Sequence, residues 1–94
     1  MNTFTAFYNK NMFSMVMDFA NGFVPLMTIK AKNLEEAFWK MQGENISPNG
    51  ELRDTIKSLG LKHTSMSVGD VLYWHEKDAH YRVEIVGFKQ VPLT

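Results

Sequence analysis

Residues with the chemical groups of a nucleophilic catalyst crowd into one short segment of this sequence. Residues 63–70 include His63, Ser65, Ser67 and Asp70, which supply an imidazole, two hydroxyls and a carboxylate. A hydroxyl nucleophile needs an adjacent base that a third group orients, so an enzyme would require His63 and Asp70 to converge in one pocket. Serine and aspartate beside a glycine also hydrogen-bond their own backbone in turns. We expect the turn, with no catalytic residue.

In this turn, Ser67 and Asp70 close the entry to a following strand. The residues expected to anchor the turn in the core are Met66, Val68 and Val71. Local crowding of catalytic residue types adds little to the enzyme hypothesis, because catalytic triads are assembled by geometry rather than by sequence position.

The three histidines are the other candidates for site chemistry. They are His63, His75 and His80, and Glu76 and Asp78 lie between the last two. Because the chain has no cysteine, a zinc site would have to use imidazole and carboxylate ligands at fixed geometry. Side chains at the tip of a loop are normally solvated. We therefore predict no metal and no cofactor, and we place His80 as a cross-strand partner at the edge of a hairpin.

Aromatic residues around the same hairpin suggest a nucleic-acid surface. Trp74 and Tyr81 could stack unpaired bases on a sheet face, while Arg82, Lys89 and Lys62 contact phosphates. Such surfaces normally have a positive groove, whereas ten basic residues balance ten acidic ones in this chain, and Glu76, Asp78 and Glu84 lie near these rings. Ordinary cross-strand aromatic packing is therefore the better account of these residues. A nucleic-acid-binding module is the alternative hypothesis, and steep weakening of binding by salt would identify it.

Four segments have the residue pattern of strands. Residues 3–8 alternate Phe4, Ala6 and Tyr8 with a second face, as a half-buried strand does. Of the run Phe23–Ala31 only Leu26–Lys30 is predicted as strand, because Pro25 cannot donate to a ladder. The two remaining runs are Val71–Trp74 and Tyr81–Lys89, joined by the polar loop His75–Ala79.

Two helices are predicted between these strands. The clearer one covers Asn33–Gln42, with Asn33 as N-cap, Glu36 as its capping-box partner and Gly43 at its end. Its inward stripe is Leu34, Ala37, Phe38 and Met41. The second begins near Ser47–Asn49, ends at Leu59 before Gly60, and should lie at the surface. Its thin apolar stripe is Leu52, Thr55, Ile56 and Leu59.

Trp39 lies about 150° from the inward stripe of the first helix and should be exposed. Exposed tryptophan is typical of binding hot spots. The other possibility is that the segment 12–20, which fits either a helix or a hairpin strand ahead of Asn21-Gly22, folds over Trp39. The predicted partner-binding residues are Trp39, Met12, Phe13, Met15 and Phe19.

The order of these elements resembles the YodL-like family of small bacterial, phage and mobile-element domains. The resemblance rests on Leu34–Phe38, on Ser65–Val71 (SMSVGDV), on Tyr81 and on Gly87-Phe88. Gly69 stands where the family more often has serine, and residues 1–22 do not match. The resemblance implies an α+β fold and a phage or mobile-element context, and little chemistry.

Together these features predict one α+β domain over residues 1–94, as its length allows. We expect a small, mainly antiparallel sheet of four or five strands, packed on one face by two helices. The leading function is a non-enzymatic interaction module that binds a host or self protein. A homodimer could pair through Thr3–Tyr8 or Tyr81–Lys89. Residues 12–27, the most apolar stretch, are interrupted by polar residues and a proline, so we expect a cytoplasmic protein without a membrane span.

Overall fold

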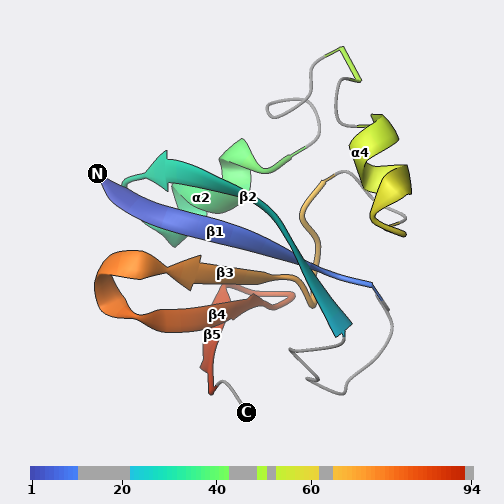
Figure 1. Ribbon diagram of the computed structural model, residues 1–94. Helices are drawn as coiled ribbons and strands as arrows, with labels where there is room; N and C mark the ends of the chain where they lie inside the picture. The colour runs from blue at the N-terminus through green and yellow to red at the C-terminus, as the bar shows by residue number, and fades with distance from the viewer. Residues whose placement is uncertain (11–21, 43–48, 51–52, 62–64, 93–94) are drawn as a thin grey trace.

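A five-stranded antiparallel sheet organises the protein in a computed structural model that describes residues 1–10, 22–42, 49–50, 53–61 and 65–92. The strand order is β2-β1-β3-β4-β5, so β2 and β5 are the outer strands (Figure 1). The strands are β1 (Asn2–Asn9), β2 (Phe23–Ala31), β3 (Val71–Trp74), β4 (Ala79–Val83) and β5 (Phe88–Val91). The predicted α+β class and the antiparallel sheet are confirmed.

The alternation of β1 separates the two faces of the sheet. Phe4, Ala6 and Tyr8 have no exposed surface and face the core, while Thr3 and Thr5 point to the opposite face. Burial, assisted by the charge of Asp70, raises the pKa of the Tyr8 phenol. The core residues drawn from strands, helices and connections are Phe4, Ala6, Tyr8, Ala31, Ala37, Met41, Ile56, Leu61, Met66, Leu72 and Val83.

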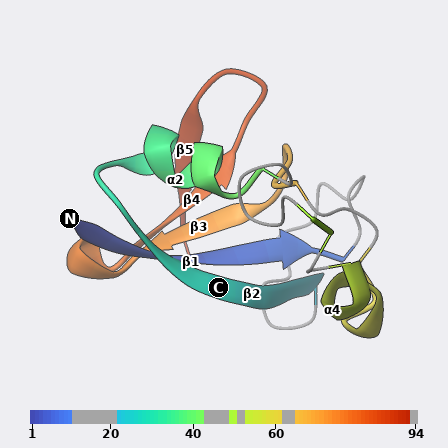
Figure 2. The same ribbon diagram turned by 90° about the horizontal axis from the view of Figure 1, so that it is seen from above.

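Helix α2 (Leu34–Lys40) begins as the sequence predicts. The Asn33 side chain accepts a hydrogen bond from the Glu36 N–H at 2.9 Å. The Glu36 carboxylate in turn accepts from the N–H of Lys32, one residue before the N-cap, at 3.1 Å. Ala37 and Met41 are fully buried, with Leu34 and Phe38 packed beside them. Figure 2 shows α2 over one face of the sheet. The expected end at Gly43 lies outside the described residues.

The second helix, α4 (Arg53–Ser58), begins later than predicted. Asn49 and Gly50 form a turn instead, and the Gly50 carbonyl accepts from the Arg53 N–H at 3.2 Å. Gly50 has a φ of +79°, which a helix cannot accommodate. Ile56 is the buried residue of α4, whereas Thr55, expected to face inward, is exposed. The surface position is confirmed, and Ser47, Pro48 and Leu52 lie outside the described residues.

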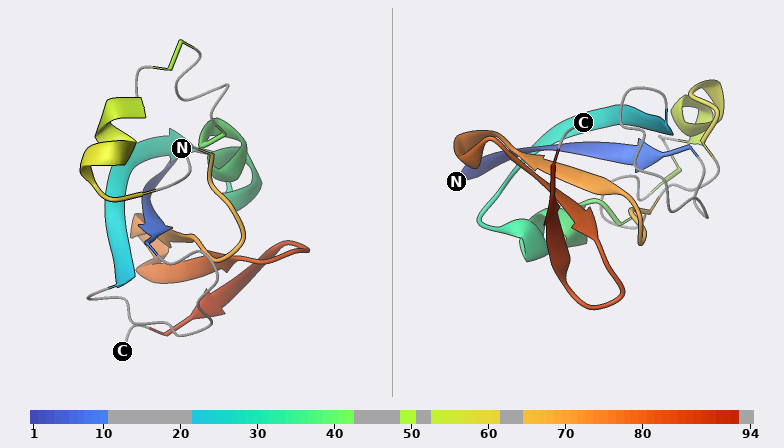
Figure 3. Two further views of the ribbon diagram at one scale, coloured as in Figure 1. Left: turned by 90° about the vertical axis from the view of Figure 1, so that its right-hand side faces the viewer. Right: turned by 90° about the horizontal axis from the view of Figure 1, so that it is seen from below.

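Two strand predictions need correction. The run Tyr81–Lys89 is not one strand, because a turn at 84–87 divides it into β4 and β5. β2 starts at Phe23 rather than Leu26, and the β1–β2 register shifts so that Leu26 is an extra residue between Met27 and Pro25. Since β2 is an outer strand, Pro25 can occupy it without breaking an internal ladder. Figure 3 shows β5 turned strongly across β4.

Candidate interaction groove

The segment predicted to close a turn does so through the buried carboxylate of Asp70, which is 1% exposed. One carboxylate oxygen accepts from the Asn9 N–H and the other from the Ser67 N–H, both at 2.8 Å. Met66 and Val71 are buried as expected, but Val68 is 50% exposed. Asp70 therefore joins the end of β1 to the turn before β3, which supports the turn interpretation. His63 lies outside the described residues.

The histidines of the β3–β4 connection enter hydrogen bonds and ring contacts. His75 Nε2 lies 2.6 Å from Thr5 Oγ1, and the His80 ring lies 4.4 Å from the Tyr73 ring. His80 is a cross-strand partner of Tyr73, as predicted, but it is buried in an interior strand rather than at a hairpin edge. Of the two nearby carboxylates, Glu76 accepts from the Thr3 N–H and Asp78 from the Tyr73 hydroxyl. Within the described ranges no group of three or more such side chains could hold a metal ion.

The proposed nucleic-acid residues do not share one face. Trp74 lies opposite Phe4 and Tyr81 opposite Leu72, which places both rings on the core face. The Trp74 ring packs 5.0 Å from Phe4 and 6.0 Å from Tyr81, and its indole nitrogen is buried without a hydrogen-bond partner among the described residues. Arg82 and Lys89 lie opposite each other in the β4–β5 ladder, with their side chains on the other face of the sheet. A base-stacking surface with these two cations beside it is therefore not formed.

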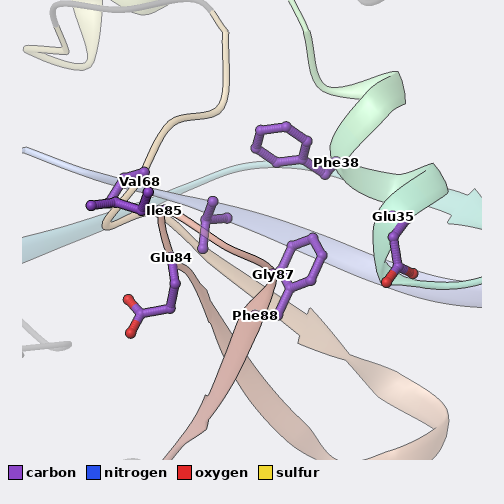
Figure 4. A pocket seen from close by; sticks show the side chains of 8 residues that line it. Glu35, Phe38, Val68, Glu84, Ile85, Gly87 and Phe88 are labelled. Carbon is purple, nitrogen blue, oxygen red and sulfur yellow. The ribbon is translucent and has the colours of Figure 1, made fainter.

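An apolar groove lies instead between α2 and the β4–β5 hairpin. Its volume is about 350 Å³, and it is lined by Glu35, Phe38, Val68, Val83, Glu84, Ile85, Gly87 and Phe88. The Phe38 and Phe88 rings meet edge to face at 6.1 Å. Figure 4 shows Val68 and Ile85 together on one side of these rings and Glu35 on the other. Three segments far apart in the sequence thus build one apolar surface.

The tip of the β4–β5 hairpin continues this surface into solvent. Ile85 and Val86 are 90% and 89% exposed, at positions where hairpins usually have glycine, asparagine or aspartate. The turn is closed by a bond from the Glu84 N–H to the Gly87 carbonyl at 3.0 Å. Gly87 supplies the left-handed conformation, with a φ of +75°. The glycine therefore allows two branched apolar residues to occupy the tip.

The charged side chains at the groove differ in their pairing. Glu84 accepts two hydrogen bonds from the Arg82 guanidinium, at 2.9 and 3.2 Å, which hold the pKa of its carboxyl below the usual range. Its carboxylate points away from the groove in Figure 4. Glu35 has no ion-pair partner in the part of the chain that the structure describes. The groove therefore carries one uncompensated negative charge at its border.

Trp39 is exposed as predicted, at 60%, but it does not line the groove. It follows Phe38 on α2 and stands one helical turn from Glu35, so it lies on the same helix as the groove border. The other predicted partner-binding residues, Met12, Phe13, Met15 and Phe19, lie outside the described residues.

Sequence reasoning missed Ile85, Val86, Phe88 and Val68 as surface residues. The available signal was the step Ile85-Val86-Gly87 after a polar Glu84, which is a turn pattern with an apolar tip. Reading 81–89 as one strand concealed it. The homodimer prediction fails for Thr3–Tyr8, because β1 is an interior strand.

Comparison with known proteins gives no relative for this chain. No family model, no curated protein and no solved structure matches it. The resemblance to the YodL-like family therefore stays a prediction. No helix within the described residues is long and apolar enough to cross a membrane.

Proposed function

We propose that this protein is a non-enzymatic interaction module that binds a partner protein through the groove between α2 and the β4–β5 hairpin. The observation that carries the proposal is the hairpin tip, where Ile85 and Val86 place apolar side chains almost entirely in solvent. Exposed apolar surface beside a hollow is typical of protein-binding sites. The YodL-like resemblance adds the proposal that a phage or mobile element encodes the protein and that the partner belongs to the host.

The composition of the groove supports a protein partner over other ligands. Phe38 and Phe88 give it two aromatic rings, which are enriched at the centres of protein interfaces. The neighbouring charges are carboxylates, which repel phosphate. Trp39 extends the surface along α2, so a partner large enough to cover the groove and the tip can also reach this side chain.

Affinity capture with matched variants tests this proposal. Tagged wild-type protein and an Ile85→Ser/Val86→Ser variant are incubated with host lysate at low and moderate salt. The expected result is a stoichiometric partner that survives moderate salt and is lost from the variant, because both apolar side chains leave the interface. Trp39→Ala, run alongside, tests whether the interface reaches α2.

An Asp54→Ser/Lys57→Ser variant is the control, since it alters two exposed residues of α4 and leaves the net charge unchanged. The control should retain the partner. Equal capture by the hairpin variant, with its fold intact by circular dichroism, would contradict the groove as the binding surface. Capture of nucleic acid alone, removed by salt, would favour the nucleic-acid hypothesis instead.

A further inference from the structure

The outer strand β5 presents backbone groups beside the groove. In an antiparallel pair, residues alternate between bonding the neighbouring strand and pointing their N–H and C=O away from it. The Val83 N–H donates to Asp70 on the β3 side, and Val83 lies opposite Phe88. Because the backbone of Val83 bonds toward β3, its partner Phe88 makes no backbone bond to β4. The N–H and C=O groups of Phe88, and those of Gln90 two residues later, therefore point toward the open edge. Both residues also face the groove side of the sheet, because they lie opposite Val83 and Tyr81.

The other outer strand, β2, is obstructed at its edge. Pro25 has no N–H to offer, and the extra residue Leu26 interrupts the regular ladder. The outward Lys30 carbonyl already accepts a hydrogen bond from the Lys40 ammonium of α2 at 2.7 Å. Bulges, proline and lysine are known means of preventing a further strand from pairing. No comparable bulge or side-chain bond occupies the outward backbone of β5 in the described part of the chain.

We propose that an extended segment of a partner protein pairs with β5 as a sixth strand and places one large apolar side chain in the groove. This inference rests on the proposed function and specifies how the partner is recognised. Strand addition gives affinity through main-chain hydrogen bonds and specificity through pockets for alternate side chains. The backbones of Phe88 and Gln90 offer the main-chain hydrogen bonds, and the groove beside Phe88 is the side-chain pocket.

Charge complementarity defines the partner further. Side chains two residues apart on a strand lie on one face and about 7 Å apart. A lysine or arginine two positions from the apolar residue would therefore meet uncompensated Glu35 at the groove border. Lys89 lies on the opposite face of β5 and is exposed, so it favours an acidic residue at the intervening position. The recognised segment is apolar, acidic and basic in successive positions.

A second copy of this chain is a poorer occupant. Two-fold antiparallel pairing centred on Lys89 places the two Lys89 side chains directly opposite each other, where like charges are destabilising. Pairing centred on Gln90 places Pro92, which has no N–H, opposite the outward backbone of Phe88. The sequence of β5 thus favours a partner of different sequence over self-association.

Selection from a displayed library of random heptapeptides on the full-length protein tests the inference. The enriched peptides should share the apolar, acidic and basic pattern. Their synthetic forms are then titrated against Gln90→Pro and Gln90→Ala, which remove the same side chain but differ in the outward N–H. We expect Gln90→Pro to weaken binding about tenfold, the equivalent of one main-chain hydrogen bond, and Gln90→Ala to leave it within about twofold.

The amide spectrum of Gln90→Pro shows whether this variant folds. We expect it to fold, because the Gln90 N–H that proline removes makes no bond to β4. If Gln90→Pro and Gln90→Ala bind the peptides with equal affinity, while Ile85→Ser/Val86→Ser no longer binds them, strand addition is overturned and the groove remains the binding surface. Failure to enrich any peptide above background would overturn the inference. If the wild-type protein sediments as a dimer and Gln90→Pro is a monomer, the inference is also overturned, and a second copy of the chain is the strand that pairs with β5.

Discussion

The two outer strands of the sheet end it in opposite ways. β2 is nine residues long, and Pro25, the bulge at Leu26 and the Lys40 bond to the Lys30 carbonyl together obstruct its edge. β5 has four residues, and its outward backbone lies next to the apolar groove. A long unobstructed edge invites aggregation, whereas a short one offers a limited register. The β2 edge is therefore obstructed, and the edge left open is the one that lies beside the apolar groove.

The support of the two edges differs as well. Helix α2 contacts β2 directly, and its Lys40 ammonium donates a hydrogen bond to the Lys30 carbonyl of β2. The obstructed edge is therefore supported by the helix. The β4–β5 hairpin is held at its base by Asp70, whose carbonyl accepts from the Val83 N–H at 2.8 Å. The buried carboxylate and carbonyl of Asp70 therefore help to position the open edge, together with the β3–β4 ladder, and changes at Asp70 should have large effects.

Asp70→Ala should destabilise the protein more than any other single substitution considered for the two edges. The buried N–H of Asn9 and the partly buried N–H of Ser67 lose their acceptor, which should lower the free energy of unfolding by about 2–5 kcal/mol. Denaturant unfolding measures the change. Ser67→Ala is the matched control, because Ser67 bonds Asp70 through its backbone. Its hydroxyl bonds the Ser65 carbonyl instead. Similar losses in both variants would refute the role assigned to the carboxylate.

Gly87→Ala should have the next largest effect. A φ of +75° strains any L side chain, so we expect a loss of about 1–2 kcal/mol of folding free energy together with weaker partner binding. Thermal unfolding and a binding titration report the two effects. Gly22→Ala serves for comparison, since Gly22 is not among the glycines of positive φ and has open space for a methyl group. A tolerated alanine at 87 would show that the hairpin tip needs no left-handed residue.

Lys40→Met should cost less, at most about 1 kcal/mol, because the Lys40 side chain is partly solvated. Its removal uncovers the Lys30 carbonyl and unpairs Glu36. Combined with Pro25→Val, it should make β2 competent for pairing and produce concentration-dependent association in sedimentation. Gln90→Pro added to this double variant should not abolish the association. If it does, association uses β5 and the contrast between the edges is wrong.

The smallest effect expected is a pH dependence from His80, which lies opposite Tyr73 of β3 and Val91 of β5. Burial lowers the pKa of His80, and the charge of Asp78 partly opposes this. The unfolded chain, with an ordinary histidine pKa of about 6.5, then takes up a proton first as the pH falls. Stability should be constant above that pH and decline below it. His80→Gln should flatten this decline, and an unchanged slope would assign it to other groups.

Much of the fold could be predicted because local signals agreed with the final packing. The alternation at Phe4, Ala6 and Tyr8 and the capping of α2 by Asn33 both require only neighbouring residues. The start of α4 could not be predicted from periodicity, because Gly50 acts through its backbone conformation. The division of 81–89 was missed although Gly87 marks a turn, because the apolar residues Ile85 and Val86 continue the strand pattern across it. The aromatic residues of the β3–β4 hairpin were expected to pack across the strands rather than to stack bases, and the contacts of Trp74 with Phe4 and Tyr81 confirm the packing.

The groove could not be predicted, because Phe38, Val68 and Phe88 meet only through the tertiary arrangement of α2, the turn before β3 and β5. Exposure of Trp39 was predictable from helical periodicity alone. The sequence therefore supported a partner-binding surface on α2. The other side of the groove is the β4–β5 hairpin, and the apolar residues at the tip of this hairpin have the sequence pattern of a strand interior.

Amide hydrogen exchange along β5, measured by NMR with and without a selected peptide, tests whether β5 is the recognition edge. In the free protein the Phe88 and Gln90 amides should exchange much faster than that of Lys89, which faces β4. Bound peptide should slow exchange at Phe88 and Gln90 and leave the amides of β2 unchanged. Protection that appears along β2 instead, with no change at Phe88 and Gln90, would contradict the assignment of β5 as the recognition edge.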